Sequence, residues 1–148
     1  MRADVVAAAR GWLGTPYVHQ ASCRGGGCDC LGLVRGVWRE LYGCEPEAAP
    51  AYSADWGEPG GIEILWRAAE RHLRLRRQGD AGAPGDLLLL RMRERSIAKH
   101  LGIAAEGPGG PTFVHAMSGK GVLESPLSAP WARRIVARFE FPNLDVGA

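Results

Sequence analysis

One stretch of the chain decides how the fold is built: CDCLGLVRGVWRELYG, at residues 28–43. Asp29 is a typical helix N-cap residue, and Gly43 fits the position that follows the last helical turn. The apolar residues between them recur at helical spacing: Leu31, Val34, Trp38 and Leu41. We therefore predict a largely buried helix over residues 30–42.

Upstream of this helix the sequence predicts a shorter helix and then a loop. Residues 3–13 carry apolar side chains at helical spacing, and Gly14 followed by Pro16 ends that helix. The segment YVHQASCRGGGCD, residues 17–29, is rich in Gly and polar residues. Because such a segment does not favour regular structure, we predict a loop that leads into the Asp29 cap.

Downstream of the buried helix the pattern changes from helical to strand-like. A Pro-rich connection, residues 43–60, precedes a second amphipathic helix over residues 62–73 with an Arg-rich outer side. Short apolar or alternating runs then predict four strands and a weaker fifth, at 87–90, 100–105, 112–116, 135–139 and 121–124. Helices followed by closely spaced strands favour an α+β fold with an antiparallel sheet.

Length and composition indicate one globular domain spanning residues 1–148. The chain is 46% hydrophobic and 23% charged, close to globular averages, and its net charge is only +2. The basic residues are scattered, so we expect no nucleic-acid partner. No apolar run approaches the roughly 20 residues of a membrane-spanning helix, and the N-terminus lacks a signal-peptide pattern. We expect a soluble chain, made in the cytoplasm and without a membrane anchor.

The cysteines allow three interpretations. Cys30 lies where a loop enters a helix, and a helix N-terminus lowers the pKa of a thiol and suits it to be a nucleophile. The second interpretation is a zinc site formed by His19, Cys23, Cys28 and Cys30 or Cys44; the Cys-x-Cys spacing departs from ordinary zinc sites. The third is a structural disulfide, such as Cys23 with Cys28, which needs an oxidising compartment.

A nucleophilic thiol needs a base and a group that orients the base. Among the histidines, His100 and His115 lie on consecutive predicted strands. If Ala105 pairs with Thr112, His115 lies opposite Gly102 and diagonal to His100, with about 7–8 Å between their Cα atoms. Both rings then point the same way and can share a hydrogen bond. Either histidine alone is more often an ordinary buried strand residue.

Five short motifs resemble, in order and spacing, those of the NlpC/P60 cysteine peptidases. They are GTPY at 14–17, CDCLGL at 28–33, GDLL at 85–88, KHLGI at 99–103 and FVHA at 113–116. The resemblance spans about residues 3–142 and looks closest to the phage-type branch, which includes gene transfer agent tail proteins. It implies a papain-like α+β fold with the nucleophile helix packed on an antiparallel sheet.

The resemblance also implies a role for each matching residue. Cys30 matches the nucleophile, His100 the base, His115 the residue that orients the base, and Tyr17 the tyrosine that assists the oxyanion. Family members commonly cleave bacterial cell-wall stem peptides, especially D-γ-glutamyl to diamino acid linkages, without a metal. No cofactor is implied.

Two departures from the family pattern concern the surroundings of Cys30. Leu31 replaces the usual Ser, and the loop over residues 22–28 carries two further cysteines. We take Asp29, Leu31 and Gly102 as candidate substrate-binding residues and expect a pocket that differs from the usual one. Cys23 and Cys28 are hypothesised to trap Cys30 in a disulfide, because they are close in sequence.

These observations favour a peptidoglycan-cleaving cysteine peptidase that is carried to the cell wall in a phage-like tail tip, with other tail proteins as partners. Three alternatives stay open. The chain could be a tail structural or assembly protein with little hydrolysis, or a Cys-rich metal-binding module. It could also transfer an acyl group through the same thioester instead of hydrolysing it.

Overall fold

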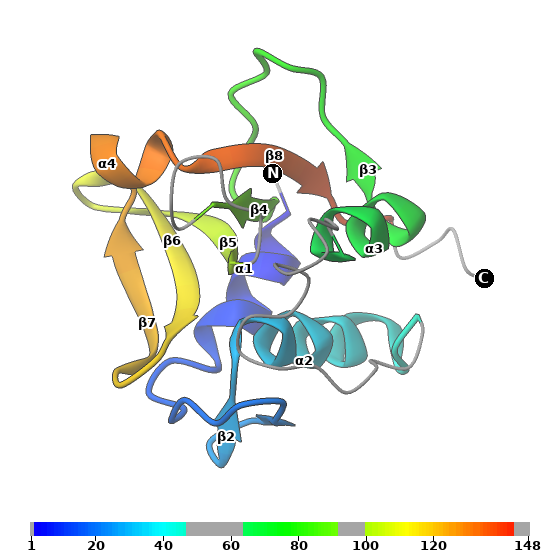
Figure 1. Cartoon of the computed structure of the whole chain (residues 1–148), viewed down its shortest axis with the longest axis vertical. Coiled ribbons are helices and arrows are strands. Elements are labelled where there is room, and N and C mark those ends of the chain that lie inside the picture. Colours follow the sequence, from blue (N-terminus) through cyan, green and yellow to red (C-terminus); the bar gives the residue numbers. More distant parts are fainter. Residues whose placement is uncertain (1, 47–63, 92–99, 144–148) are drawn as a thin grey trace.

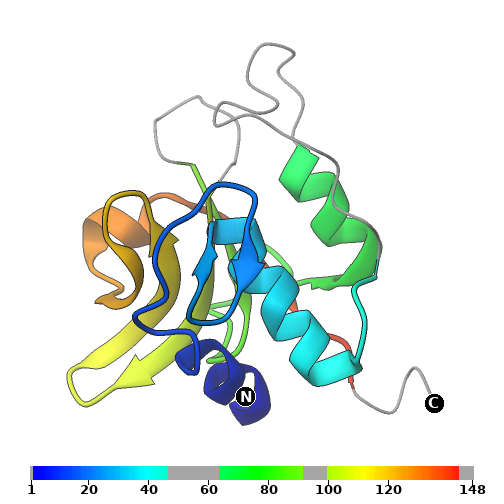
Figure 2. The same cartoon turned by 90° about the horizontal axis from the view of Figure 1, so that it is seen from below.

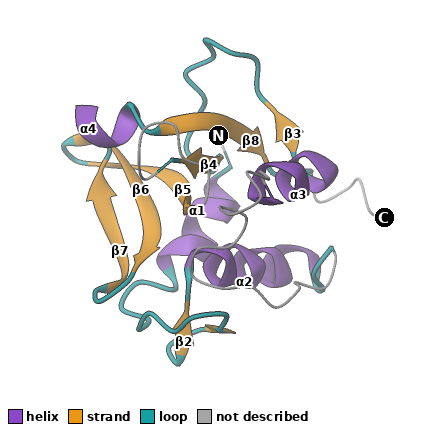
Figure 3. Cartoon of the chain, in the orientation of Figure 1, coloured by secondary structure: helices purple, strands orange, loops and turns teal. Residues whose placement is uncertain are grey.

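The fold is α+β and is built around an antiparallel sheet. The computed structural model describes residues 2–46, 64–91 and 100–143. Its elements, in chain order, are α1 (Ala3–Arg10), β1 (Ser22–Cys23), β2 (Gly27–Cys28), α2 (Cys30–Tyr42), α3 (Ile64–His72), β3 (Arg74–Leu75), β4 (Leu87–Leu90), β5 (His100–Gly107), β6 (Gly110–Met117), β7 (Gly121–Pro126), α4 (Ala129–Ala132) and β8 (Ile135–Glu140). Six strands form one sheet in the order β3-β8-β4-β5-β6-β7 (Figures 1 and 3).

The α2 helix confirms the first prediction at both ends. It starts at Cys30, where Asp29 Oδ1 accepts a hydrogen bond from the Gly32 N–H at 2.7 Å. It is followed by Gly43, whose φ of 89° lies in the left-handed region that favours glycine. The sequence signals at the two helix ends were therefore sufficient.

Apolar side chains cover both faces of the sheet. The larger core joins α1 and α2 to one face and includes Val5, Ala9, Leu33, Val37, Leu89, Leu101, Ile103, Val114 and Phe139. The smaller cluster, on the other face, contains Leu88, Leu90, Ala104 and Phe113, packed against Leu127, Trp131 and Ile135. Figures 1 and 2 show α4 at a distance from α2 and α3, at the end of the sheet formed by β6 and β7.

The N-terminal region corrects two predictions. The first helix ends at Arg10 and not at residue 13, because the next amides bond three residues back, as in Trp12 N–H to Ala9 C=O. The segment 17–29 is not a loop throughout, since β1 and β2 pair within it. Gly25 and Gly26 lie in the turn of this small hairpin, because Cys23 pairs with Gly27 across it.

The strand predictions hold, and two short elements were missed in addition to β1 and β2. The strands expected at 87–90, 100–105, 112–116, 135–139 and 121–124 correspond to β4, β5, β6, β8 and β7. The missed elements, β3 and α4, are two and four residues long. Elements of that length show no hydrophobic period. The helix predicted over 62–73 is seen as α3, and residues 62–63 lie outside the described part.

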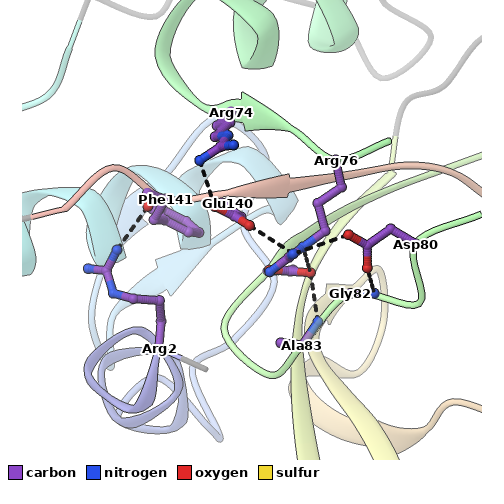
Figure 4. Close-up of polar contacts among 9 residues, drawn as sticks. Arg2, Arg74, Arg76, Asp80, Gly82, Ala83, Glu140 and Phe141 are labelled. Carbon is purple, nitrogen blue, oxygen red and sulfur yellow. Dashed lines mark hydrogen bonds and ion pairs between the residues drawn. The ribbon is translucent and has the colours of Figure 1, made fainter. Parts of the chain in front are cut away.

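An ionic network ties the sheet edge to the turn before β4 (Figure 4). Asp86, with a side chain only 3% exposed, accepts two hydrogen bonds from Arg76, at 2.7 and 2.9 Å. The same guanidinium lies 2.8 Å from Glu140 Oε1 on β8. Close by, Arg2 Nη1 donates to the carbonyl of Phe141 at 2.8 Å. These bonds hold three segments together: the residue after β3, the start of α1 and the end of β8.

In the described ranges, no helix is long and apolar enough to cross a membrane.

The contact between α2 and the turn after α1 generates a stability prediction. A Cβ at Gly36 would overlap the ring of Trp12, which is 2% exposed. Although Ala favours a helix over Gly by about 1 kcal/mol, we expect Gly36→Ala to lower the free energy of unfolding by about 1–3 kcal/mol. Urea unfolding followed by circular dichroism measures this difference. Gly109→Ala, where a Cβ meets no atom within 4 Å, is the control; equal midpoints for the two variants would contradict the prediction.

Candidate active site

The Cys30 thiol lies at the N-terminus of α2, buried between this helix and β5. The residue is 9% exposed. Burial, reinforced by the charge of Asp29, raises the pKa of the thiol to about 12, although the backbone N–H of Leu101, which hydrogen-bonds to the sulfur, acts to lower it. This corrects the prediction of a lowered pKa, because burial outweighs the helix terminus. At neutral pH the thiol is protonated and needs a base to become a thiolate.

The sheet opens at the point where the thiol sits. The ladder between β5 and β6 begins at the pair of Ile103 with Val114, whereas β5 stays paired with β4 back to its first residue. The N–H and C=O of Ala104 bond to the chain just before β4. Because successive residues of a strand direct these groups to alternate sides, the N–H of Leu101, three residues earlier, points toward β6. Beyond the end of the ladder, that N–H bonds to Cys30 instead.

His100 and His115 form the hydrogen-bonded pair that the sequence predicted. His100 Nε2 and His115 Nδ1 are 3.0 Å apart. Ala105 pairs with Thr112, so the expected register is confirmed. The two histidines are 7% and 1% exposed. On the far side of the pair, His115 Nε2 lies 2.8 Å from the hydroxyl of Ser125 on β7.

Both histidines are neutral at physiological pH. Burial lowers the pKa of His100 to about 4. Burial, together with the neighbouring His100, lowers the pKa of His115 to about 3. A neutral imidazole carries one N–H and one bare nitrogen, and the bare nitrogen can accept a proton. The pair is therefore able to receive the proton that a buried thiol must lose.

Aromatic side chains pack against the imidazole rings of His100 and His115. Phe113 stacks on His115, with 3.9 Å between ring centroids and 25° between planes. Trp131 of α4 stands nearly perpendicular to the same ring, at a centroid distance of 5.2 Å. A Cβ at Gly102 would lie 2.8 Å from Phe113 and 3.5 Å from the Cβ of His115, so this position needs glycine. The packing confirms that Gly102 leaves room beside His115.

The remaining residues singled out in the sequence surround the start of α2. Tyr17 is half-buried, and its backbone forms a bridge with that of Cys28. Burial is the main cause that raises the pKa of Tyr17 to about 12, and the charges of Cys30 and Asp29 raise it further. Both carboxylate oxygens of Asp29 accept backbone N–H groups, those of Gly32 and Gln20, at 2.7 and 2.8 Å. Leu31 is half-buried at the edge of the core.

The other cysteines do not assemble a metal site. Cys23 pairs with Gly27 and Cys28 with Ser22, so the two thiols lie on opposite faces of the hairpin. All four cysteines are thiols in the structure. Within residues 2–46, 64–91 and 100–143, no group of three or more His, Cys, Asp or Glu side chains is placed to hold a metal. The zinc interpretation therefore lacks a ligand set there.

Two residues of the site were missed from the sequence, Ser125 and Trp131. Ser125 could have been found only from the register between β6 and β7, because it pairs with Phe113 and so shares the face of His115. Trp131 belongs to a helix of four residues that leaves no period in the sequence. Neither position carries a local motif.

The comparison with protein families identifies the family of the chain. Residues 14–139 match the model of the NlpC/P60 family. The chain belongs to the NlpC/P60 family. The match begins just before Tyr17 and ends in β8, so it includes Cys30 and both histidines. A search of curated proteins gives no match.

Solved NlpC/P60 structures share the fold at low identity. The NlpC/p60 domain of the peptidoglycan hydrolase SagA is 24% identical, with a TM-score of 0.62, over 95% of this chain and 99% of that domain. An NlpC/P60 family protein of Bacillus cereus is 17% identical, with a TM-score of 0.63, over 95% of this chain. A protein of Staphylococcus aureus described as similar to a lipoprotein of the NLP/P60 family is 18% identical, with a TM-score of 0.58, over 94% of this chain. The chain spans only 40% and 41% of the latter two.

The buried histidine pair predicts an acid-sensitive fold. In the unfolded chain both histidines regain ordinary pKa values near 6.5. As the pH falls from about 6.5 toward 4, the unfolded chain binds protons that folded His100 and His115 do not, so stability is lost over this window. We expect the His100→Gln, His115→Gln double variant to lose less stability than the natural chain between pH 7 and 4, by a few kcal/mol.

Chemical denaturation at a series of pH values measures this difference. The control is His72→Gln, a histidine on α3 outside the pair. Because the substitutions leave every carboxylate in place, parallel stability curves for the natural chain and the double variant would contradict the prediction.

Proposed function

We propose that this chain is a cysteine peptidase that hydrolyses peptide bonds in bacterial cell-wall stem peptides. The observation that carries the proposal is the buried hydrogen bond between His100 and His115. His100 lies on β5 next to Leu101, whose N–H bonds to the Cys30 thiol. Family membership supports it, as does the similarity to the domain of SagA, which is described as a peptidoglycan hydrolase.

The reaction starts from a neutral thiol and a neutral imidazole. His100 takes the Cys30 proton, and the sulfur attacks the carbonyl carbon of the peptide bond. The resulting tetrahedral intermediate collapses to a thioester as the leaving amine takes the proton from His100. Water then attacks the thioester with His100 again as base, which releases the acid and restores the thiol. Since burial opposes charge at both groups, proton transfer and attack are coupled.

The same helix terminus can stabilise the oxyanion. The backbone N–H of Cys30 belongs to the first turn of α2, at the positive end of the helix dipole. Tyr17 keeps its proton at neutral pH because its pKa is raised to about 12, so its hydroxyl is a donor. We assign these two groups to the oxyanion, and Asp29, Leu31 and Gly102 to the walls of the substrate site.

The bond that we propose is the D-γ-glutamyl to diamino acid linkage of the stem peptide. The support is the motif resemblance, from CDCLGL at 28–33 to FVHA at 113–116. Leu31 stands where the resembling peptidases carry Ser, so one wall of the pocket is apolar in this chain. The linkage that is cut follows from the masses of the released fragments.

Mass spectrometry of fragments released from Gram-negative sacculi tests the activity. We expect fragments from the natural chain and from Cys23→Ala, whose thiol is exposed on the β1–β2 hairpin. Cys30→Ala should release them at least about a thousandfold more slowly, because the nucleophile is gone. A natural chain that is folded and reduced but releases nothing, or an undiminished Cys30→Ala, would overturn the proposal.

We further propose that the chain acts as a component of a phage-like tail tip. The support is the resemblance of its motifs to the phage-type branch of the family. We expect peptides of the chain in purified particles, in a fixed ratio to the tail proteins, when the particles are digested and analysed by mass spectrometry. Particles that are complete without it would contradict this placement.

A further inference from the structure

A third strand reaches the histidine pair. Ser125 Oγ lies 2.8 Å from His115 Nε2, the ring nitrogen that His100 does not use. On β6 and β7, Phe113 pairs with Ser125 and His115 pairs with Leu123, so Ser125 is the diagonal neighbour of His115. His100, His115 and Ser125 thus step diagonally across three adjacent strands on one face of the sheet.

Each link in this chain of hydrogen bonds determines the next. If His100 is the base, the nitrogen that faces the thiol must be bare. His100 Nε2 is already bonded to His115, so the bare nitrogen is Nδ1 and the proton of His100 is on Nε2. That proton is donated to His115 Nδ1, which places the proton of His115 on its own Nε2. The acceptor for that proton is the hydroxyl oxygen of Ser125.

We propose that Ser125 is a positioning residue that holds His115 in the Nε2–H form and thereby keeps His100 Nδ1 available for the Cys30 proton. The inference rests on the proposed function. The opposite arrangement, with the Ser125 hydroxyl donating to His115 Nε2, reverses every link. It places the proton of His100 on Nδ1, where it blocks the transfer.

The surroundings of His115 make the Ser125 hydroxyl important as a hydrogen-bond partner. Phe113 stacks on one face of the ring and Trp131 stands against it, so these neighbours offer packing and no acceptor for Nε2–H. His115 is only 1% exposed, which leaves little access for water. Without the Ser125 hydroxyl, the proton on His115 Nε2 loses the side-chain partner seen among the described residues and can move to Nδ1.

Nuclear magnetic resonance of the imidazole nitrogens tests the tautomer without depending on hydrolysis. In the natural chain at pH 7 we expect His115 with its proton on Nε2 and His100 likewise. Ser125→Ala should give a mixture of tautomers for both rings, and Ser125→Thr, which keeps a hydroxyl, should restore the single form. His115 with its proton on Nδ1, or an unchanged spectrum in Ser125→Ala, would overturn the inference.

Steady-state kinetics give a second test of the role of Ser125. We expect Ser125→Ala to reduce kcat by about tenfold with a smaller change in KM, and Ser125→Thr to recover most of the rate. The control is Ser128→Ala, because the Ser128 side chain makes no capping bond at α4. Melting curves establish that each variant is folded. A folded Ser125→Ala with unchanged kcat would also overturn the inference.

If the natural chain shows no hydrolysis, the peptidase proposal alone fails and the tautomers still decide the role of Ser125.

Discussion

The buried carboxylate of Asp29 holds the loop and the helix together at the place where the chemistry is proposed. One oxygen accepts the Gly32 N–H inside α2, and the other accepts the Gln20 N–H in the loop before β1. A Cβ at Gly32 would overlap the carbonyl of Ala21, so the loop crosses directly over the helix start. This one side chain therefore fixes the loop at Gln20 to the helical turn that begins with Cys30.

The sequence predicted the parts of the fold that have a local cause. Asp29 and Gly43 marked both ends of α2, and alternation along β5 and β6 was enough to bring His100 and His115 to one face. The hydrogen bond between them followed from a single assumption about the turn, that Ala105 pairs with Thr112. Such predictions succeed because capping and strand alternation depend on neighbouring residues.

The parts that escaped prediction have causes distant in the chain. Trp131 reaches the histidines from a helix of four residues, and Ser125 reaches them through the pairing of β6 with β7. The pKa of Cys30 was predicted from its helix terminus alone, but the packing of α2 on β5 buries the thiol and reverses the shift. Burial depends on tertiary contacts, and no motif around residue 30 contains them.

The place of β8 in the sheet has a consequence for the order in which the protein can form. Among the described strands this one comes last in sequence order, yet it lies between β3 and β4. While a ribosome is still making residues 135–140, β4 has a bare edge on that side and β3 has no partner in the sheet. The sheet is therefore completed only after residues 135–140 have left the ribosome. A sheet assembled in this way closes in one late step, when β8 enters between its two neighbours.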